Sequence, residues 1–136
     1  RAVSVVHGDW SPKNLLAADG EMWAIDWEVV HFGDPGFDAG FLLNHLVLKS
    51  IAMPERRTGF EGLARVFLEA LAAELGDDAD GVIASAFEHL PALLLARADG
   101  KSPAEYLDEA GRERARAVSR SLMTRRAGAV EDVFGR

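Results

Sequence analysis

The sequence contains no cysteine, and it lacks a long apolar run. Without cysteine, disulfide bonds, thiolate catalysis and zinc sites built on cysteine ligands are excluded, which suits a cytoplasmic location. The longest apolar stretch, residues 41–48, is interrupted by Asn44 and His45 and is much shorter than the ~20 residues that span a bilayer. We therefore expect a cytoplasmic protein with no membrane partner.

Positive charge is also scarce. The 136 residues include 15 Lys and Arg against 22 Asp and Glu, which gives a formal net charge of −7 and a pI of about 5.0. Nucleic acids are bound through patches of Lys and Arg, so we expect no nucleic-acid partner. The acidic surface is compatible with a cationic small molecule, although bulk charge governs solubility and steering rather than a site.

The remaining composition is that of an ordinary globular domain. Hydrophobic residues make up 49% of the chain and charged residues 27%, which is enough apolar material for a real core. The length suits one compact unit. The sequence therefore predicts a single domain over residues 1–136.

Two short stretches hold the side chains best suited to chemistry. Residues 5–14 contain Asp9 and Asn14, and residues 24–28 contain Asp26. All three side chains end in oxygen-bearing groups, which are the ligands that magnesium prefers. This cluster predicts magnesium and phosphoryl chemistry if the two stretches come together.

A hairpin between the two stretches would bring them together. Residues 15–17 and 22–27 have the composition of two strands, and Asp19-Gly20 between them tolerates the positive φ of a tight turn. Folding at this turn returns Asp26 toward Asn14. The two side chains could then share a metal ion.

The order and spacing of these residues match the catalytic loop of kinases. In that loop an Asp is followed, after four intervening residues, by an Asn, as Asp9 is followed by Asn14 here. The Asp orients the acceptor hydroxyl, the Asn binds one magnesium ion, and a later Asp binds the metal that bridges the phosphates. The sequence therefore predicts Asp9 as the catalytic base and Asn14 and Asp26 as metal ligands.

Three ordered motifs carry a family resemblance. They are His7-Gly8-Asp9-x-x-Pro12-x-Asn14, Ile25-Asp26-Trp27-Glu28 and Gly33-Asp34-Pro35-x-x-Asp38. With them the chain resembles the aminoglycoside phosphotransferase and choline kinase-like family, small-molecule kinases that share the protein-kinase fold. The resemblance implies Mg2+ as cofactor, ATP or GTP as phosphoryl donor, and a small-molecule hydroxyl as acceptor. Aminoglycosides, choline, homoserine and methylthioribose are acceptors in the family, and nothing in the sequence selects among them.

The chain departs from the protein-kinase pattern in two ways. Gly8 and Ser11 stand where serine/threonine kinases carry Arg and Lys, which fits the small-molecule branch. A glycine-rich phosphate loop and the strand Lys paired with a helix Glu are missing, because the chain begins six residues before His7. We therefore expect the carboxy-terminal lobe of a longer kinase, without its nucleotide lobe.

Two expectations follow for the isolated chain. It should bind ATP weakly or not at all and have no useful turnover, because half of the nucleotide cleft would be absent. It should also expose an apolar surface where the other lobe would pack, and a homodimer through that surface is a further expectation.

Other motif residues have supporting roles in this interpretation. His7 is expected to bond the backbone and hold the loop, since magnesium favours oxygen over a histidine nitrogen. By the resemblance, Asp38 hydrogen-bonds the backbone of the catalytic loop. Ser11, Lys13 and Glu28 are candidates for a phosphate or substrate contact, with a plain surface role as the alternative for Lys13 and Glu28.

The rest of the chain predicts mainly helices. Expected elements are a strand or helix end at 2–6, a short connection at 29–33, a helix capped by Asp34 with Pro35 first and running to Ile51, helices at 60–75 and from 77–80 to Ala98, a helix starting at the capping box Ser102–Glu105, an Arg-rich helix at 112–126 and a frayed tail at 127–136. The fold class is therefore mainly α (α+β). The resemblance makes it the helical carboxy-terminal lobe of a kinase-like fold with a small β-hairpin at its active edge.

Two other functions remain open at this point. One is a non-catalytic, kinase-like binding module, against which the joint presence of Asp9, Asn14 and Asp26 counts. The other is a metal-dependent phosphohydrolase with water as acceptor, whose two-metal sites usually need more carboxylate or His ligands than this cluster offers.

Overall fold

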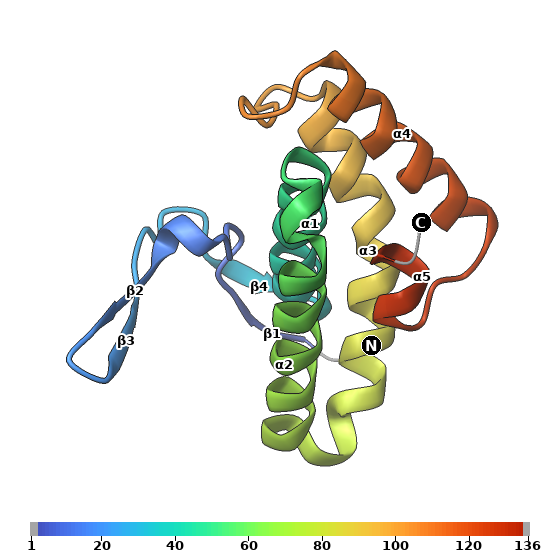
Figure 1. Ribbon diagram of the computed structural model, residues 1–136. Helices are drawn as coiled ribbons and strands as arrows, with labels where there is room; N and C mark the ends of the chain where they lie inside the picture. The colour runs from blue at the N-terminus through green and yellow to red at the C-terminus, as the bar shows by residue number, and fades with distance from the viewer. Residues whose placement is uncertain (1–2, 135–136) are drawn as a thin grey trace.

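The computed structural model describes residues 3–134, and helices dominate it (Figure 1). The helices are α1 (Gly36–Ala52), α2 (Arg57–Leu75), α3 (Ala79–Asp99), α4 (Glu109–Thr124) and α5 (Val130–Phe134), with short 3-10 turns at Pro12–Asn14, Pro54–Arg56 and Gly76–Asp78. The strands are β1 (Ser4–Val6), β2 (Leu15–Ala18), β3 (Glu21–Ala24) and β4 (His31–Gly33). The sequence predicts a mainly helical fold with one small hairpin, and the second strand pair was not predicted.

The core lies between α1 and α3, with α2 and α4 packed around them. α1 is buried on most of its circumference, because apolar side chains fill nearly every position from Leu42 to Leu48. α3 presents Leu90 and Leu94, both 0% exposed, to this core. Burial of side chains of this kind contributes about 1.5–3 kcal/mol each, so the helical body carries most of the folding free energy.

Small residues set the distance between α1 and α3. A Cβ on Gly40 would lie 2.7 Å from the Ala86 carbonyl oxygen, and one on Gly36 would lie 2.6 Å from Ser85 Cβ. Any side chain at these positions would push the helices apart. The two glycines are one turn apart on α1, so they form a continuous strip of close approach.

The strands form two separate antiparallel pairs. β2 pairs with β3, with Leu15 opposite Ala24, and Asp19 and Gly20 take φ of 51° and 81° in the turn between them. This is the hairpin that the sequence predicts. β1 pairs with β4, with Val6 opposite His31, and so returns the chain to the start of α1.

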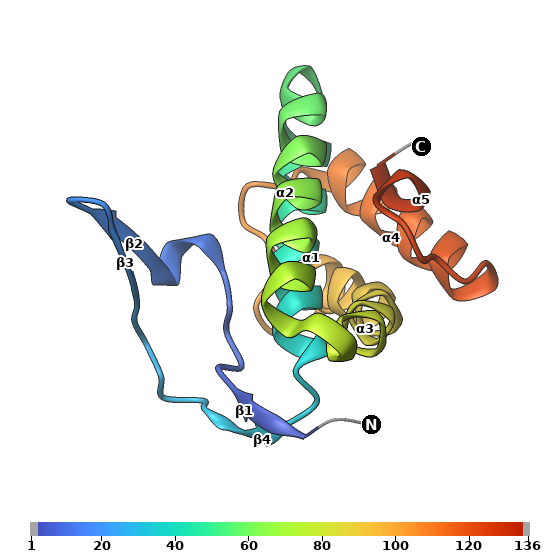
Figure 2. The ribbon, with the colours of Figure 1, turned by 90° about the horizontal axis from the view of Figure 1, so that it is seen from below.

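The amino-terminal segment stands apart from the helices. In both views the β2–β3 hairpin points away from the helical body, while β1 and β4 run along its edge (Figures 1 and 2). Many large apolar side chains of this segment are exposed, among them Met22 at 70% and Phe32 at 78%. The segment is therefore not covered by the rest of the described chain.

The start of the fourth long helix differs from the prediction. The expected capping box at Ser102–Glu105 does not begin a helix, and α4 instead begins at Glu109. Asp108 is its N-cap, and the Asp108 side chain accepts a hydrogen bond from the Gly111 N–H at 2.7 Å. Ser102 and Asp108 are both suitable N-cap residues. Ala104 and Leu107 are buried, however, and this burial keeps residues 101–108 as a packed loop.

Four further differences concern two short elements and the starts of two helices. The expected tail contains α5, because Val133 and Phe134 are buried against the core. The expected connection at 29–33 contains β4, and α2 begins at Arg57 rather than at residue 60. Pro35 occupies the N-cap position that was expected for Asp34. Residue 2 of the expected first strand and residues 135–136 of the expected tail lie outside the described part of the chain.

The stretch Pro54–Asp99 contains a window that is long and apolar enough to cross a membrane by length and composition alone. The stretch comprises α2, α3 and the 3-10 turn before each of them, and 44% of the window is buried in the fold. A core helix meets the same criterion, so this is weak evidence for a membrane span.

Candidate active site

His7 connects the two motif stretches and is only 2% exposed. Its Nδ1 accepts a hydrogen bond from the Asp9 backbone N–H at 3.2 Å, and its Nε2 bonds the Ile25 carbonyl oxygen at 2.9 Å. Because a nitrogen that accepts carries no proton, this pattern fits the tautomer protonated at Nε2. The ring also packs against Trp27, with 4.6 Å between ring centroids. Both ring nitrogens are thus engaged in holding the loop.

Asp38, in the first turn of α1, fixes the backbone of the same loop. Its Oδ2 accepts from the His7 N–H at 2.7 Å, and its Oδ1 accepts from the Gly8 N–H at 3.0 Å. Gly8 has a φ of +86°, and a Cβ there would lie 2.8 Å from the Val29 carbonyl oxygen. Only glycine fits this position without strain. The loop shape therefore depends on one carboxylate and one glycine.

Asp34 ties the third motif to α3. Its Oδ1 accepts from the Gly36 N–H at 2.9 Å, and its Oδ2 accepts from the Ser85 hydroxyl at 2.5 Å and lies 3.4 Å from His89 Nε2. Burial acts to raise the pKa of Asp34, but the hydrogen bonds from Ser85, Gly36 and His89 outweigh it and hold the pKa below its ordinary value. The start of α1 is thereby anchored to the core.

Asp9 and Asn14 are in direct contact. The Asn14 Nδ2 group donates to the Asp9 backbone oxygen at 2.9 Å and to Asp9 Oδ2 at 3.1 Å, and Asn14 is 3% exposed. Lys13 Nζ lies 3.4 Å from the same carboxylate oxygen. The Asn14 amide oxygen, which is the atom that a metal would need, takes no part in these bonds.

Asp26 is brought to this loop by its neighbour in the chain. The Ile25 N–H donates to the Asn14 carbonyl oxygen at 3.0 Å, and the Ile25 carbonyl bonds His7 as described above. Asp26 follows directly, with a φ of +64° that is unusual for a residue with a side chain. Such strain is commonly found at functional sites, because the surroundings must hold it.

The donor set fits a magnesium ion that is shared with a nucleotide. Within residues 3–134, no three His, Cys, Asp or Glu side chains are grouped to hold a metal by themselves. Magnesium bound with ATP usually takes only one or two protein oxygens and completes its octahedron with phosphates and water. Asn14 and Asp26 could supply two such oxygens.

A pocket of about 200 Å³ opens beside Asp9. Its wall is formed by the catalytic-loop segment 9–13, by α1 and by residues around the end of α3. The lining residues are Asp9, Ser11, Pro12, Lys13, His45, Lys49, Arg97 and Tyr106. The pocket is thus placed where an acceptor hydroxyl could meet the Asp9 carboxylate.

The pocket has an unusual electrostatic environment. The pKa of His45 falls to about 4, mainly because the ring is buried and because Arg97 lies nearby, with Lys49 and Lys13 adding to the effect and Asp9 opposing it. His45 is therefore neutral at pH 7. Burial raises the pKa of Tyr106, and the charge of Arg97 works against that rise.

The sequence-predicted candidates are not all brought together. Asp9, Ser11 and Lys13 line the pocket, whereas Glu28 is exposed in the turn after Trp27. Ser11 is 1% exposed. The sequence alone gave no functional role to His45, Lys49, Arg97 or Tyr106. The four-residue spacing of His45 and Lys49 on one helix was the available signal, while Arg97 and Tyr106 gave none.

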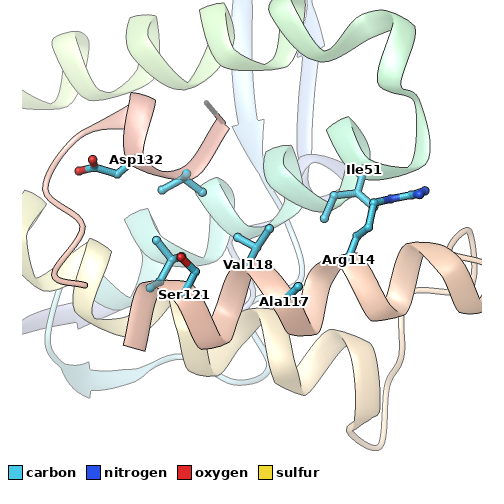
Figure 3. Close-up of a pocket in the computed structure, with 8 residues that line it drawn as sticks. Ile51, Arg114, Ala117, Val118, Ser121 and Asp132 are labelled. Carbon is cyan, nitrogen blue, oxygen red and sulfur yellow. The ribbon is translucent and has the colours of Figure 1, made fainter. Parts of the chain in front are cut away.

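A second pocket, of about 290 Å³, lies between α1, α4 and α5 (Figure 3). Val118, Ala117 and Ser121 face it from α4, Ile51 from α1 and Asp132 from α5. None of its lining residues comes from the motif stretches. We therefore place the chemistry at the pocket beside Asp9.

Comparison with known proteins agrees with the motifs. Residues 1–65 match the profile of the Phosphotransferase enzyme family. We call these residues, which are similar to that family, the phosphotransferase segment. The phosphotransferase segment contains the three sequence motifs and the pocket lining except for Arg97 and Tyr106. No solved structure matches the chain significantly.

Part of the chain is also similar to methylthioribose kinases. It is 38% identical over 53 residues to the enzyme of Citrobacter koseri, which is 39% of this chain and 13% of that protein. It is 34% identical over 65 residues to the enzyme of Geobacillus thermodenitrificans, covering 46% of this chain and 16% of that protein. The enzyme of Yersinia enterocolitica is 37% identical over 54 residues, which is 40% of this chain and 14% of that protein. The matched part thus spans a small fraction of each relative.

Proposed function

We propose that this chain is the carboxy-terminal lobe of an ATP-dependent kinase with a protein-kinase-like fold that phosphorylates a hydroxyl group of a small molecule. The observation that carries the proposal is the direct contact of Asp9 with Asn14, together with the backbone bond that ties Asn14 to Ile25, next to Asp26. The family of residues 1–65 supports it. A cytoplasmic location, where ATP is abundant, is part of the proposal.

Each residue has a defined task in this reaction. Asp9 orients the acceptor hydroxyl and receives its proton as the oxygen–phosphorus bond forms and the bond to the leaving ADP breaks. Asn14 and Asp26 would hold magnesium, which supplies positive charge to the phosphates when it is bound with the nucleotide. His7 and Asp38 hold the loop so that Asp9 and Asn14 keep their geometry. Such positioning is the main source of rate in phosphoryl transfer.

The test is magnesium-dependent release of ADP by the longer protein of which we propose this chain is a part. Acceptors would include methylthioribose, choline, aminoglycosides, sugars, amino alcohols, hydroxy acids and sugar phosphates. We expect release that depends on one acceptor class and falls by about 10²–10⁴-fold in Asp9→Ala, as for loss of a catalytic base. Asp77→Ala, at an exposed position between α2 and α3, is the matched control and should retain the activity.

Two results would contradict the proposal. Turnover by the 136-residue chain alone would show that no second lobe is needed. Silence with every acceptor, and no thermal shift with nucleotide, would favour the non-catalytic binding module.

A further inference from the structure

The pocket beside Asp9 has a charge opposite to that of the whole chain. Asp9 is the one carboxylate among its lining residues, against the cations Lys13, Lys49 and Arg97. The chain as a whole carries −7. Lys13 lies 3.4 Å from Asp9, so it compensates that carboxylate and leaves two cations in excess.

The two remaining cations are not matched by acids. Within residues 3–134, neither Lys49 nor Arg97 forms an ion pair with a carboxylate. Lys49 Nζ instead lies 5.1 Å from the centre of the Tyr106 ring. The Arg97 Nε is buried and has no hydrogen-bond partner among the described residues, which costs free energy unless a ligand compensates the guanidinium.

The pocket wall also carries an unused hydroxyl. Ser11 is 1% exposed, and its Oγ has no hydrogen-bond partner within the described residues. A buried hydroxyl is normally satisfied. By rotation it could donate to an acceptor oxygen in the pocket, which adds a neutral donor to Lys49 and Arg97.

We propose that this pocket binds an anionic group of the acceptor, a carboxylate or a phosphate, between Lys49 and Arg97. The inference rests on the proposed function, because it assigns the anion to the molecule whose hydroxyl meets Asp9. The acceptor class is then a hydroxy acid or a sugar phosphate. Cationic acceptors such as choline and aminoglycosides are disfavoured, because they would have to approach two uncompensated cations.

The geometry explains why an anion and the reaction are compatible. Lys13 pairs with Asp9 and screens that carboxylate from the acceptor anion. His45 is neutral, so it adds no charge and can hydrogen-bond the acceptor. An anion held at Lys49 and Arg97 therefore leaves the neighbouring hydroxyl free to approach Asp9.

The experiment is a binding titration of the 136-residue chain followed by nuclear magnetic resonance. The probes are glycerol 3-phosphate, glycerate, glycerol and choline, which share small size and differ in charge. We expect the two anions to shift the amide signals of Lys49 and Tyr106 and to bind about tenfold or more tightly than glycerol. Choline should bind no better than glycerol.

Matched variants locate the binding. Lys49→Gln and Arg97→Gln should each lose most of the preference for the anions over glycerol. Arg125→Gln removes the same charge from an exposed position outside the pocket and should keep it. The amide spectrum of each variant reports whether it is folded, and either of the two pocket variants is sufficient for the test.

Two outcomes would overturn the inference. One is equal binding of the anions and glycerol by the unaltered chain. The other is an unchanged preference for the anions in both Lys49→Gln and Arg97→Gln, which would place the anion away from these two cations. Because the readout needs no turnover, failure of the kinase proposal leaves this result separately interpretable.

Discussion

The helical body and the amino-terminal segment are held together by different forces. The body, residues 36–134, contains all of the clustered hydrophobic core, including Leu43, Leu90 and Leu94. Segment 3–33 has few buried side chains, and three of them, His7, Ser11 and Asn14, are polar. The body is therefore stabilised by burial, and the segment by hydrogen bonds to the body.

Because of this difference, hydrogen bonds rather than apolar packing hold the candidate site residues in place. Asp38 and Asp34 connect the segment to α1 and α3 through hydrogen bonds, while much of the apolar surface of the segment remains exposed. Exposed apolar surface of this extent normally marks an interaction site. Under the proposed function the nucleotide lobe would cover it, and pairing of two copies stays the other prediction.

The largest expected effect tests the comparison directly. Leu90→Ala leaves a cavity in the core, and we expect the free energy of unfolding to fall by about 2–5 kcal/mol. Met22→Ala in the hairpin removes a side chain that is 70% exposed, and we expect a change within about ±0.5 kcal/mol. Urea unfolding followed by far-ultraviolet circular dichroism measures both. A comparable loss in the two variants would show that the hairpin is part of the cooperative core.

Local patterns were sufficient to predict part of the fold. The hairpin around Asp19-Gly20 and the helices α1, α2 and α3 follow from turn residues, apolar spacing and Gly76, all of which act over a few residues. β4 and α5 were missed because their reasons are tertiary. β4 exists by pairing with β1, more than 20 residues earlier, and α5 by burying Phe134.

The site shows the same division. The motif order predicted a cluster of Asp9, Asn14 and Asp26, since a hairpin is a local device that joins them. The cationic wall of the pocket could not be predicted, because Arg97 comes from the end of α3 and its approach to Asp9 depends on packing. The overall charge of the chain was compatible with a cationic small molecule, whereas under our further inference the pocket binds an anion.

Measuring the free energy of unfolding against pH tests how strongly the helical body is coupled, through His45, to the loop that contains Asp9. Its pKa in the folded protein is about 4, against an ordinary value of 6.5, so on acidification the unfolded chain binds a proton first. The stabilisation that comes from neutral His45 should be fully present above about pH 6.5. Through this residue the free energy of unfolding should fall by about 2 kcal/mol between pH 7 and pH 5. Arg97, Lys49 and Lys13 add to this depression and Asp9 opposes it.

The matched variants separate this effect from general acid unfolding. His45→Gln should flatten the slope between pH 7 and pH 5, while His31→Gln, on exposed β4, should keep it. An unchanged slope in His45→Gln would mean that the ring is not the source of the pH dependence.

The smallest expected effect is local and concerns Asp38. Asp38→Asn removes the charge from the acceptor of two hydrogen bonds, and bonds to a charged group are the stronger kind. We expect the His7 and Gly8 amides to exchange with solvent about 5- to 30-fold faster, which corresponds to about 1–2 kcal/mol of local stability. Amides in α1 and α3 should exchange at nearly their original rates, because the body is held by burial rather than by this carboxylate.

Asp77→Asn, exposed between α2 and α3, is the control and should change neither set of exchange rates. Faster exchange throughout α1 and α3 in the Asp38 variant would instead mean that segment and body unfold as one unit.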